Sequence, residues 1–172
     1  MRALALLLAF FVSAPALADQ LRVAVAANFT APARELAGLF KERSGHEAVL
    51  SFGSSGQFYA QITQAAPFDV FLSADAERPE KLVKDGLALA ESRFTYAIGR
   101  LVLWSRDQRA DAGEAALRQS FSKLAIANPA AAPYGGAALD VLRHVGLLDA
   151  LRARLVQGTS IAQTFQLSLI HI

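Results

Sequence analysis

The 172-residue sequence has no cysteine, only three histidines and almost no excess charge. The lack of cysteine excludes a disulfide-stapled scaffold and every metal, thiol or redox site that needs a thiolate. Lysine and arginine number 17 against 15 aspartate and glutamate, a formal net charge of +2. That excess is too small to predict nucleic-acid binding, and no basic stretch is interleaved with aromatic residues. Internal repeats and low-complexity linkers are also missing from the sequence.

The apolar content, in contrast, is high. Hydrophobic residues make up 53% of the sequence, and with balanced charge this composition excludes a disordered chain. An ordinary domain has about 100–200 residues, so the length predicts one domain, or one and a fraction.

The first residues have the pattern of a secretory signal peptide. Met1-Arg2 is a short positive start, and an unbroken apolar run follows from Ala3 to Val12. Ala16-Leu17-Ala18 puts small residues where a signal peptidase cleaves, before Asp19. The apolar run is too short for a membrane span, which takes about 20 residues. The sequence therefore predicts a cleaved signal at residues 1–18 and export to a bacterial periplasm.

Beyond the signal, short apolar runs alternate with segments of helical spacing. Strands are predicted at residues 21–27, 48–52, 68–73, 97–104 and 124–127. Helical segments are predicted from residue 31 to a stop at Gly45, and then at 57–65, 76–85, 115–121, 136–145, 148–155 and 160–165. Strands that are separated by helices are typical of parallel sheets, so the predicted fold class is α/β.

Four turns that lead into helices are rich in hydrogen-bond donors: residues 27–30, 53–56, 128–136 and 158–161. In an open α/β sheet, ligands bind at the carboxyl ends of the strands, where such turns lie. The unpaired N–H groups and the positive end of the dipole make a helix start suitable for an anion. None of the four turns has a basic residue, which indicates a compact anion held by neutral donors. The alternative is that these Ser and Asn residues only cap the helices.

Four motifs occur in order along the chain. They are Ala-Ala-Asn-Phe-Thr at 26–30, Ser-Phe-Gly-Ser-Ser-Gly at 51–56, Pro-Phe-Asp-Val-Phe-Leu-Ser-Ala-Asp at 67–75, and the Asn-Pro to Pro-Tyr-Gly stretch at 128–135. Together they resemble the periplasmic molybdate-binding proteins of ABC transporters. The resemblance covers residues 21–165, which correspond to about two thirds of such a mature chain.

The resemblance implies a two-lobe periplasmic binding protein fold of the type II kind, closing on a tetrahedral oxyanion. Residues 19–98 would form lobe I and residues 99–165 part of lobe II. Residues 166–172 form an atypical tail without a cap or a helical continuation, and the alternative is a genuine short strand. We expect a C-terminally truncated or frame-shifted chain, with the second lobe and the C-terminal return incomplete. Open strand edges and a small second core would then weaken or abolish molybdate binding.

The resemblance also implies a ligand set. Asn28 and Ser55 would bind the oxyanion from lobe I through side chain and backbone N–H, although many members have serine where Asn28 stands. Tyr134 and Ile161 would bind from lobe II, chiefly through backbone N–H. The metal of the molybdate would be held only through its oxygen atoms, by the same four residues. Tyr134 could instead be a turn aromatic that packs on the second lobe, and Asp75 is expected to cap a helix.

The expected selectivity among oxyanions depends on whether each ion carries a proton near neutral pH. Molybdate and tungstate are fully deprotonated dianions near neutral pH, so a site of donors alone satisfies every oxygen. Hydrogen phosphate brings a proton that such a site leaves unpaired, at a cost of ~1–3 kcal/mol. Sulfate is a smaller ion and would be excluded by size. The implied function is high-affinity periplasmic binding of molybdate and tungstate for delivery to an ABC permease. We expect a monomer without catalysis, cofactor or nucleic acid.

Two other classes remain open at this point. A binding protein for sulfate, thiosulfate, ferric ion or an organic anion would share the same general pattern. A serine hydrolase would need Ser55, His144 and Asp140 to form a triad. Gly-Ser-Ser-Gly at 53–56 does not fit the Gly-x-Ser-x-Gly turn of such enzymes.

Overall fold

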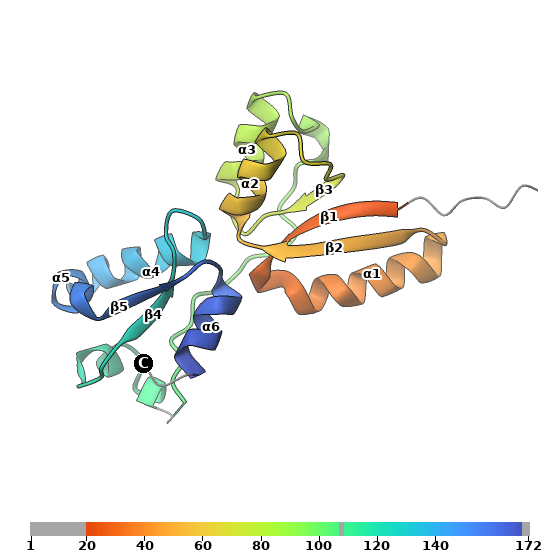
Figure 1. Ribbon diagram of the computed structural model, residues 1–172. Helices are drawn as coiled ribbons and strands as arrows, with labels where there is room; N and C mark the ends of the chain where they lie inside the picture. The colour runs from red at the N-terminus through yellow and green to blue at the C-terminus, as the bar shows by residue number, and fades with distance from the viewer. Residues whose placement is uncertain (1–19, 107–108, 170–172) are drawn as a thin grey trace, which may run out of the picture.

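The computed structural model of the chain describes residues 20–106 and 109–169 (Figure 1). The predicted signal peptide and residues 170–172 of the tail lie outside these ranges. Within the described ranges, no helix has both the length and the apolar character that crossing a membrane requires.

The first group of elements contains a three-stranded parallel sheet in the order β2-β1-β3. Its strands are β1 (Gln20–Ala26), β2 (Glu47–Gly53) and β3 (Val70–Leu72). The helices that follow them are α1 (Thr30–Ser44), α2 (Ser55–Thr63) and α3 (Glu77–Lys84). Ala26 pairs with Gly53, so the carboxyl ends of β1 and β2 lie side by side. The turns after these two strands therefore share one edge of the sheet.

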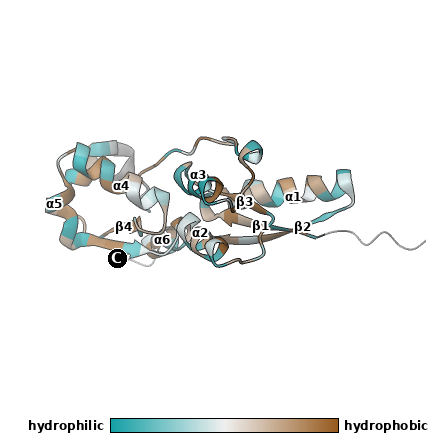
Figure 2. Cartoon of the chain, turned by 90° about the horizontal axis from the view of Figure 1, so that it is seen from above, coloured by the Kyte–Doolittle hydropathy of each residue, from teal (hydrophilic) through white to brown (hydrophobic). Residues whose placement is uncertain are grey.

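Strand β1 is the buried centre of this group. Its residues Val23 to Ala26 are at most 4% exposed. A parallel strand that is covered on both faces needs a continuous apolar run, which this segment has. Val23, Val25 and Ala33 form the buried centre of the core, against which Phe29, Leu50, Phe52 and Leu72 among others pack. Figure 2 shows the same strands as largely hydrophobic between more hydrophilic helices.

The second group contains two parallel strands, β4 (Leu124–Ala127) and β5 (Leu155–Gly158), with Ala127 paired to Gly158. Its helices are α4 (Pro133–His144), α5 (Leu148–Leu151) and α6 (Ile161–Leu169). Leu117, Leu142 and Leu151 form its buried core. The carboxyl ends of β4 and β5 also lie side by side. The predicted α/β class is therefore confirmed in both groups.

Short 3-10 helices complete the chain: Ala27–Phe29 after β1, Ala90–Ser92 and Arg109–Arg118 between the two groups, and Arg152–Arg154 before β5. The segment between α3 and β4 runs from one group to the other (Figure 1, green). The lobe boundary near residue 98 falls within it and stays a prediction.

The prediction of a strand at residues 97–104 is wrong. Residues 93–105 have no regular secondary structure, although the segment is rich in β-branched and aliphatic residues. Such composition favours an extended chain, but a strand also needs a neighbour that completes the ladder of hydrogen bonds. None of the described strands pairs with this segment. Ile98 and Val102 are 88% and 77% exposed as a result.

Other element boundaries also differ from expectation. Strand β5 was not predicted: its first residue was included in the helical segment expected at 148–155, and its last in the turn expected at 158–161. Helix α6 continues to Leu169, so the expectation that the helical pattern stops at 165 is wrong. Apolar residues at 161, 165 and 169 keep a four-residue helical spacing that the apolar tail obscured. The expected helix at 115–121 is a 3-10 helix that ends at Arg118.

We predict that the second group depends on its own small core. Leu142 is 3% exposed, whereas its neighbour Val141 on the same helix is 43% exposed. Leu142→Ala should lower the free energy of unfolding by about 2–5 kcal/mol, because it leaves a cavity in a packed interior. Val141→Ala is the matched control and should change it by less than about 1 kcal/mol. Urea unfolding of both variants measures the difference, and equal losses would contradict the assignment of this core.

Candidate functional site

Three helices begin directly beyond the carboxyl ends of strands. Helix α2 begins at Ser55, two residues after β2, and α6 begins at Ile161, just after β5. Helix α4 begins at Pro133, so that Tyr134 is its second residue. The N–H groups of a helix's first turn have no carbonyl one turn earlier to bond. Helices α2 and α4 start earlier than the sequence predicts, and this earlier start places Ser55 and Tyr134 among these unpaired donors.

A small cavity lies between the two groups where these helix starts meet. Its volume is about 10 Å³, far below the ~300–1,000 Å³ typical of sites for drug-sized ligands. A volume of this size is about what one water molecule needs, so this arrangement admits a larger ligand only if the two groups move slightly apart. The cavity lining comprises Ala26, Ala27, Asn28, Gly53, Ser54, Ser55, Ala74, Ala132, Pro133, Tyr134 and Ile161. The four residues that the sequence singled out thus meet at one place, two from each group.

The two adjacent serines in this lining have different tasks. Ser54 is the N-cap of α2 in a capping box, since its side chain accepts from the Gln57 N–H while its own N–H donates to the Gln57 side chain. Ser55 is 1% exposed, and its Oγ accepts a hydrogen bond from the Ala74 N–H at 2.9 Å. Because Ser55 Oγ already accepts, its own proton remains for another acceptor. Ser55 can therefore offer both its backbone N–H and its hydroxyl to a ligand.

Asn28 and Tyr134 take different positions. Asn28 lies in the 3-10 turn after β1 and is exposed at the rim of the cavity. The alternative that Asn28 only caps α1 is wrong, since α1 has no side-chain cap. The Thr30 hydroxyl at the start of this helix donates to Ala27 O instead. The Tyr134 phenol lies against the connecting segment, where a Cβ on Gly99 would come within 2.3 Å of its oxygen. Tyr134 thus presents its backbone, rather than its hydroxyl, at the helix start.

The cavity lining has no carboxylate, imidazole, amino or guanidinium group. An anion there meets neither a repelling negative charge nor a neutralising positive one. The positive ends of the α2, α4 and α6 dipoles and their free N–H groups favour negative charge instead. The arrangement can hold a small, desolvated, acceptor-rich ion by hydrogen bonds alone.

The two groups touch at the mouth of the cavity. The Gly56 N–H of α2 donates to Ala131 O in the β4–α4 turn at 2.8 Å. A Cβ on Gly56 would lie 2.7 Å from that same oxygen and 2.9 Å from Ala131 Cα. Glycine is therefore required here by the close approach of two backbones.

The segment that follows β3 supports the site in a way the sequence analysis missed. The Ala74 N–H orients Ser55, and the Tyr96 hydroxyl donates to Ser73 O at 2.6 Å. The Tyr96 ring also packs edge-on against Phe29, with centroids 4.9 Å apart. Ser-Ala-Asp at 73–75 stands at the end of a predicted strand, and so at the same sheet edge as the other turns. This position is the sequence signal from which a role for Ala74 could have been predicted. The expectation that Asp75 caps the next helix is consistent with its Oδ1 accepting from the Arg78 N–H at 3.3 Å.

The hydrolase alternative is not supported by this geometry. The cavity lining includes Ser55 but neither His144 nor Asp140, which both lie near the end of α4. Asp140 is paired with Arg143 instead. In the part of the chain that the structure describes, no three His, Asp or Glu residues gather as a metal-ion site.

Two α/β groups that meet around a small donor-lined cavity define a two-lobe binding protein. The chain belongs to the bacterial extracellular solute-binding proteins, whose family model matches residues 21–169. Membership of this family places the chain among proteins that bind solutes.

Individual relatives point in the same direction. The chain is 51% identical over 165 residues to the molybdate-binding protein ModA of Rhodobacter capsulatus, covering 95% of this chain and 66% of that protein. It is 51% identical over 151 residues to ModA of Azotobacter vinelandii, covering 87% of this chain and 60% of the relative. The solved periplasmic molybdate-binding protein of Azotobacter vinelandii superposes with a TM-score of 0.81 at 47% identity, over 86% of this chain and 66% of that one. The chain thus spans slightly less than two thirds of the length of these relatives.

We predict that Gly56→Ala keeps the two groups apart. The added methyl would collide with the Ala131 backbone, which cannot move aside as a flexible side chain could. Ligand affinity should fall by roughly tenfold or more, while each group stays folded. Gly136→Ala is the matched control, since nothing lies within 4 Å of its Cβ position and alanine favours a helix. Affinity titrations of both variants, with circular dichroism, provide the measurement; equal affinities would contradict the close approach.

We also predict an alkaline loss of stability that depends on Tyr96. Burial raises the pKa of Tyr96 above its usual value of 10, and Tyr134 raises it further. The stabilisation is therefore full below pH ~10 and is lost as the pH rises toward the higher folded-state pKa. At pH 7, Tyr96→Phe should cost about 0.5–1.5 kcal/mol through the lost bond to Ser73 O.

Urea unfolding of wild type and Tyr96→Phe, at neutral pH and at about pH 11, tests this. The difference in the free energy of unfolding between the two proteins should be smaller at the higher pH. An unchanged difference would show that Tyr96 is not the group whose ionisation causes the alkaline loss of stability. Tyr59→Phe serves as the tyrosine control, because among the described residues its hydroxyl makes no hydrogen bond.

Proposed function

We propose that the protein binds molybdate, and equally tungstate, in the periplasm and delivers it to the membrane permease of an ABC importer. The observation that carries the proposal is the convergence of three helix starts and the Ser55 hydroxyl on one small cavity without charged side chains. Asn28, Ser55, Tyr134 and Ile161 are the proposed ligands. The relatives named molybdate-binding proteins, at 51% identity, support the same choice of ligand.

The donor set explains the choice among oxyanions. Every oxygen of a fully deprotonated dianion accepts hydrogen bonds, so the helix-start N–H groups and the Ser55 proton can satisfy all of them. A protonated phosphate would bury a donor without an acceptor, at a cost of ~1–3 kcal/mol. Sulfate has the same acceptor pattern but shorter bonds, so donors placed for the larger ion stand too far from its oxygens. Molybdate and tungstate are nearly equal in size, so both should bind.

The remaining parts of the proposal concern the cellular setting. The signal-peptide pattern before Asp19 supports export to the periplasm, and the family supports a role in solute uptake. The protein would act as a monomer that holds its ligand without a cofactor and without catalysis. A transporter permease is its proposed protein partner.

Calorimetric titration of the purified protein with molybdate, tungstate, sulfate and phosphate tests the function. We expect molybdate and tungstate to bind with similar affinity, and both sulfate and phosphate to bind at least roughly tenfold more weakly. The order of the affinities, rather than their absolute size, carries the test. Sulfate or phosphate binding as tightly as molybdate would refute the proposal and favour a binding protein for another oxyanion.

Ser55→Ala tests the proposed site directly. It removes a donor to the ligand and leaves the half-buried Ala74 N–H without its acceptor. Molybdate affinity should fall by roughly 10- to 100-fold, the equivalent of about 1–3 kcal/mol. Ser92→Ala is the control, because the Ser92 hydroxyl is exposed and donates locally to Leu89 O. A wild-type affinity in Ser55→Ala would remove Ser55 from the ligand set.

A further inference from the structure

We propose that Arg78 is a latch across the mouth of the cleft, a positioning residue that holds the closed arrangement without touching the ligand. Arg78 lies in the first turn of α3, in the group built on β1. Its Nη2 donates to Ala130 O of the β4–α4 turn at 3.3 Å. The cavity lining does not include Arg78, so its contribution to binding would come from closure alone. The proposal uses the proposed ligand only as a probe of closure.

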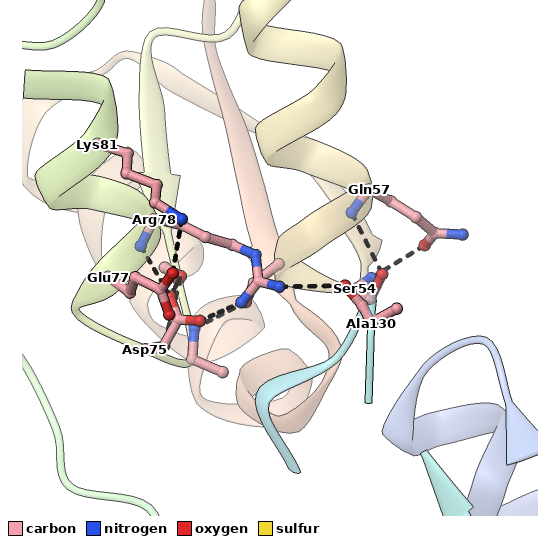
Figure 3. A network of polar contacts seen from close by, with 10 residues as sticks. Ser54, Gln57, Asp75, Glu77, Arg78, Lys81 and Ala130 are labelled. Atoms are coloured by element: carbon pink, nitrogen blue, oxygen red, sulfur yellow. Dashed lines mark hydrogen bonds and ion pairs between the residues drawn. The ribbon is translucent and has the colours of Figure 1, made fainter. Parts of the chain in front are cut away.

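Contacts within its own group hold the Arg78 side chain in the position from which it reaches Ala130 across the cleft. Its Nη1 forms an ion pair with Asp75 Oδ2, and the two side chains are only 17% and 19% exposed (Figure 3). Asp75 is itself fixed, since its Oδ1 accepts from the Ser73 hydroxyl at 3.0 Å. A planar guanidinium has separate donors in a rigid fork, so one arm can be anchored while the other reaches across. Little conformational entropy is then lost when the second hydrogen bond forms.

The accepting turn is equally well ordered. The Asn128 side chain accepts from the Ala130 N–H at 2.9 Å, and the Asn128 carbonyl accepts from the N–H groups of Ala131 and Ala132. The Asn128 N–H donates to Gly158 O, which ties the turn to β5. Ala130 and Ala131 thus offer two successive carbonyls to the other group, one to Arg78 and one to Gly56.

The consequence for the site is direct. Ala132 and Tyr134, which line the cavity, follow the latched carbonyls in the chain. Holding residues 130–131 against α2 and α3 keeps the start of α4 over the cavity. Opening would break both cross-cleft hydrogen bonds, whereas the encounter of an ion with the open site would not involve them. Arg78 should therefore slow release, and its removal should not slow association.

Two variants separate the latch from other roles of Arg78. Arg78→Met keeps an apolar stem but removes both arms. Arg78→Lys keeps a positive charge beside Asp75 but cannot bridge both partners at once. Arg93→Met is the matched control, because Arg93 pairs with Glu80 of α3 at 3.1 Å and, among the described residues, has no hydrogen bond or ion pair across the cleft.

Stopped-flow measurement with molybdate should show release that is roughly three- to tenfold faster in Arg78→Met and in Arg78→Lys, with association no slower than in the wild type. Arg93→Met should release molybdate at the wild-type rate. Wild-type release from Arg78→Met would overturn the proposal. A wild-type release rate in Arg78→Lys alone would also overturn the proposal. It would show that a positive charge beside Asp75 is enough to slow release, without a side chain that joins Asp75 to Ala130 O. Circular dichroism checks that each variant is folded. If Arg78→Met does not fold, the release rate of Arg78→Lys tests the proposal.

A second readout needs no ligand. The sequence has no cysteine, so spin labels can be placed at Lys84→Cys in one group and Ala153→Cys in the other. Distances between the labels should shift toward more open values in Arg78→Met and stay unchanged in Arg93→Met. If the wild-type protein binds no oxyanion, the proposed function fails while these distances still test the latch. Identical distance distributions in all variants would overturn the latch.

Discussion

Parallel pairing of strands is the constraint on which the rest of the structure depends. Because β1 pairs with β2 and β4 with β5 in the same direction, every strand-to-helix turn of a sheet falls at one edge. Those turns carry the unpaired N–H groups with which helices begin. When the two edges face each other, donors from Ser55, Tyr134 and Ile161 meet around one small space. No charged side chain is needed to attract an anion there, since the backbone supplies the partial charge.

Much of this arrangement could be predicted from local sequence signals. The buried run of β1, the glycine stop after α1 and the serine pair before α2 each act within a few residues, where periodicity and turn chemistry are informative. The donor-rich turns that contain the four candidate site residues follow from the same signals, whereas the choice of these particular residues came from the resemblance to a known family. The resemblance to a known family added which of the turns belong together.

The parts that could not be predicted depend on distant neighbours. Residues 97–104 have the composition of a strand, but a strand exists only where another strand pairs with it. Strand β5 has only four residues, too few for a period to show, and its existence depends on β4 beside it. The support of Ser55 by Ala74, and of the turn after β4 by Arg78, links residues that are 19 and 52 positions apart. The spacing of nearby residues does not show which distant groups such contacts join.

The neutrality of the cavity lining has a consequence for how the protein responds to its surroundings. The lining has no carboxylate, imidazole or amino group that could lose or gain a proton when an anion enters. Binding of the proposed oxyanion would therefore leave the charge of the lining unchanged. Any dependence of binding on pH would then come from the ion in solution or from groups outside the cavity, such as the Asp75–Arg78 ion pair.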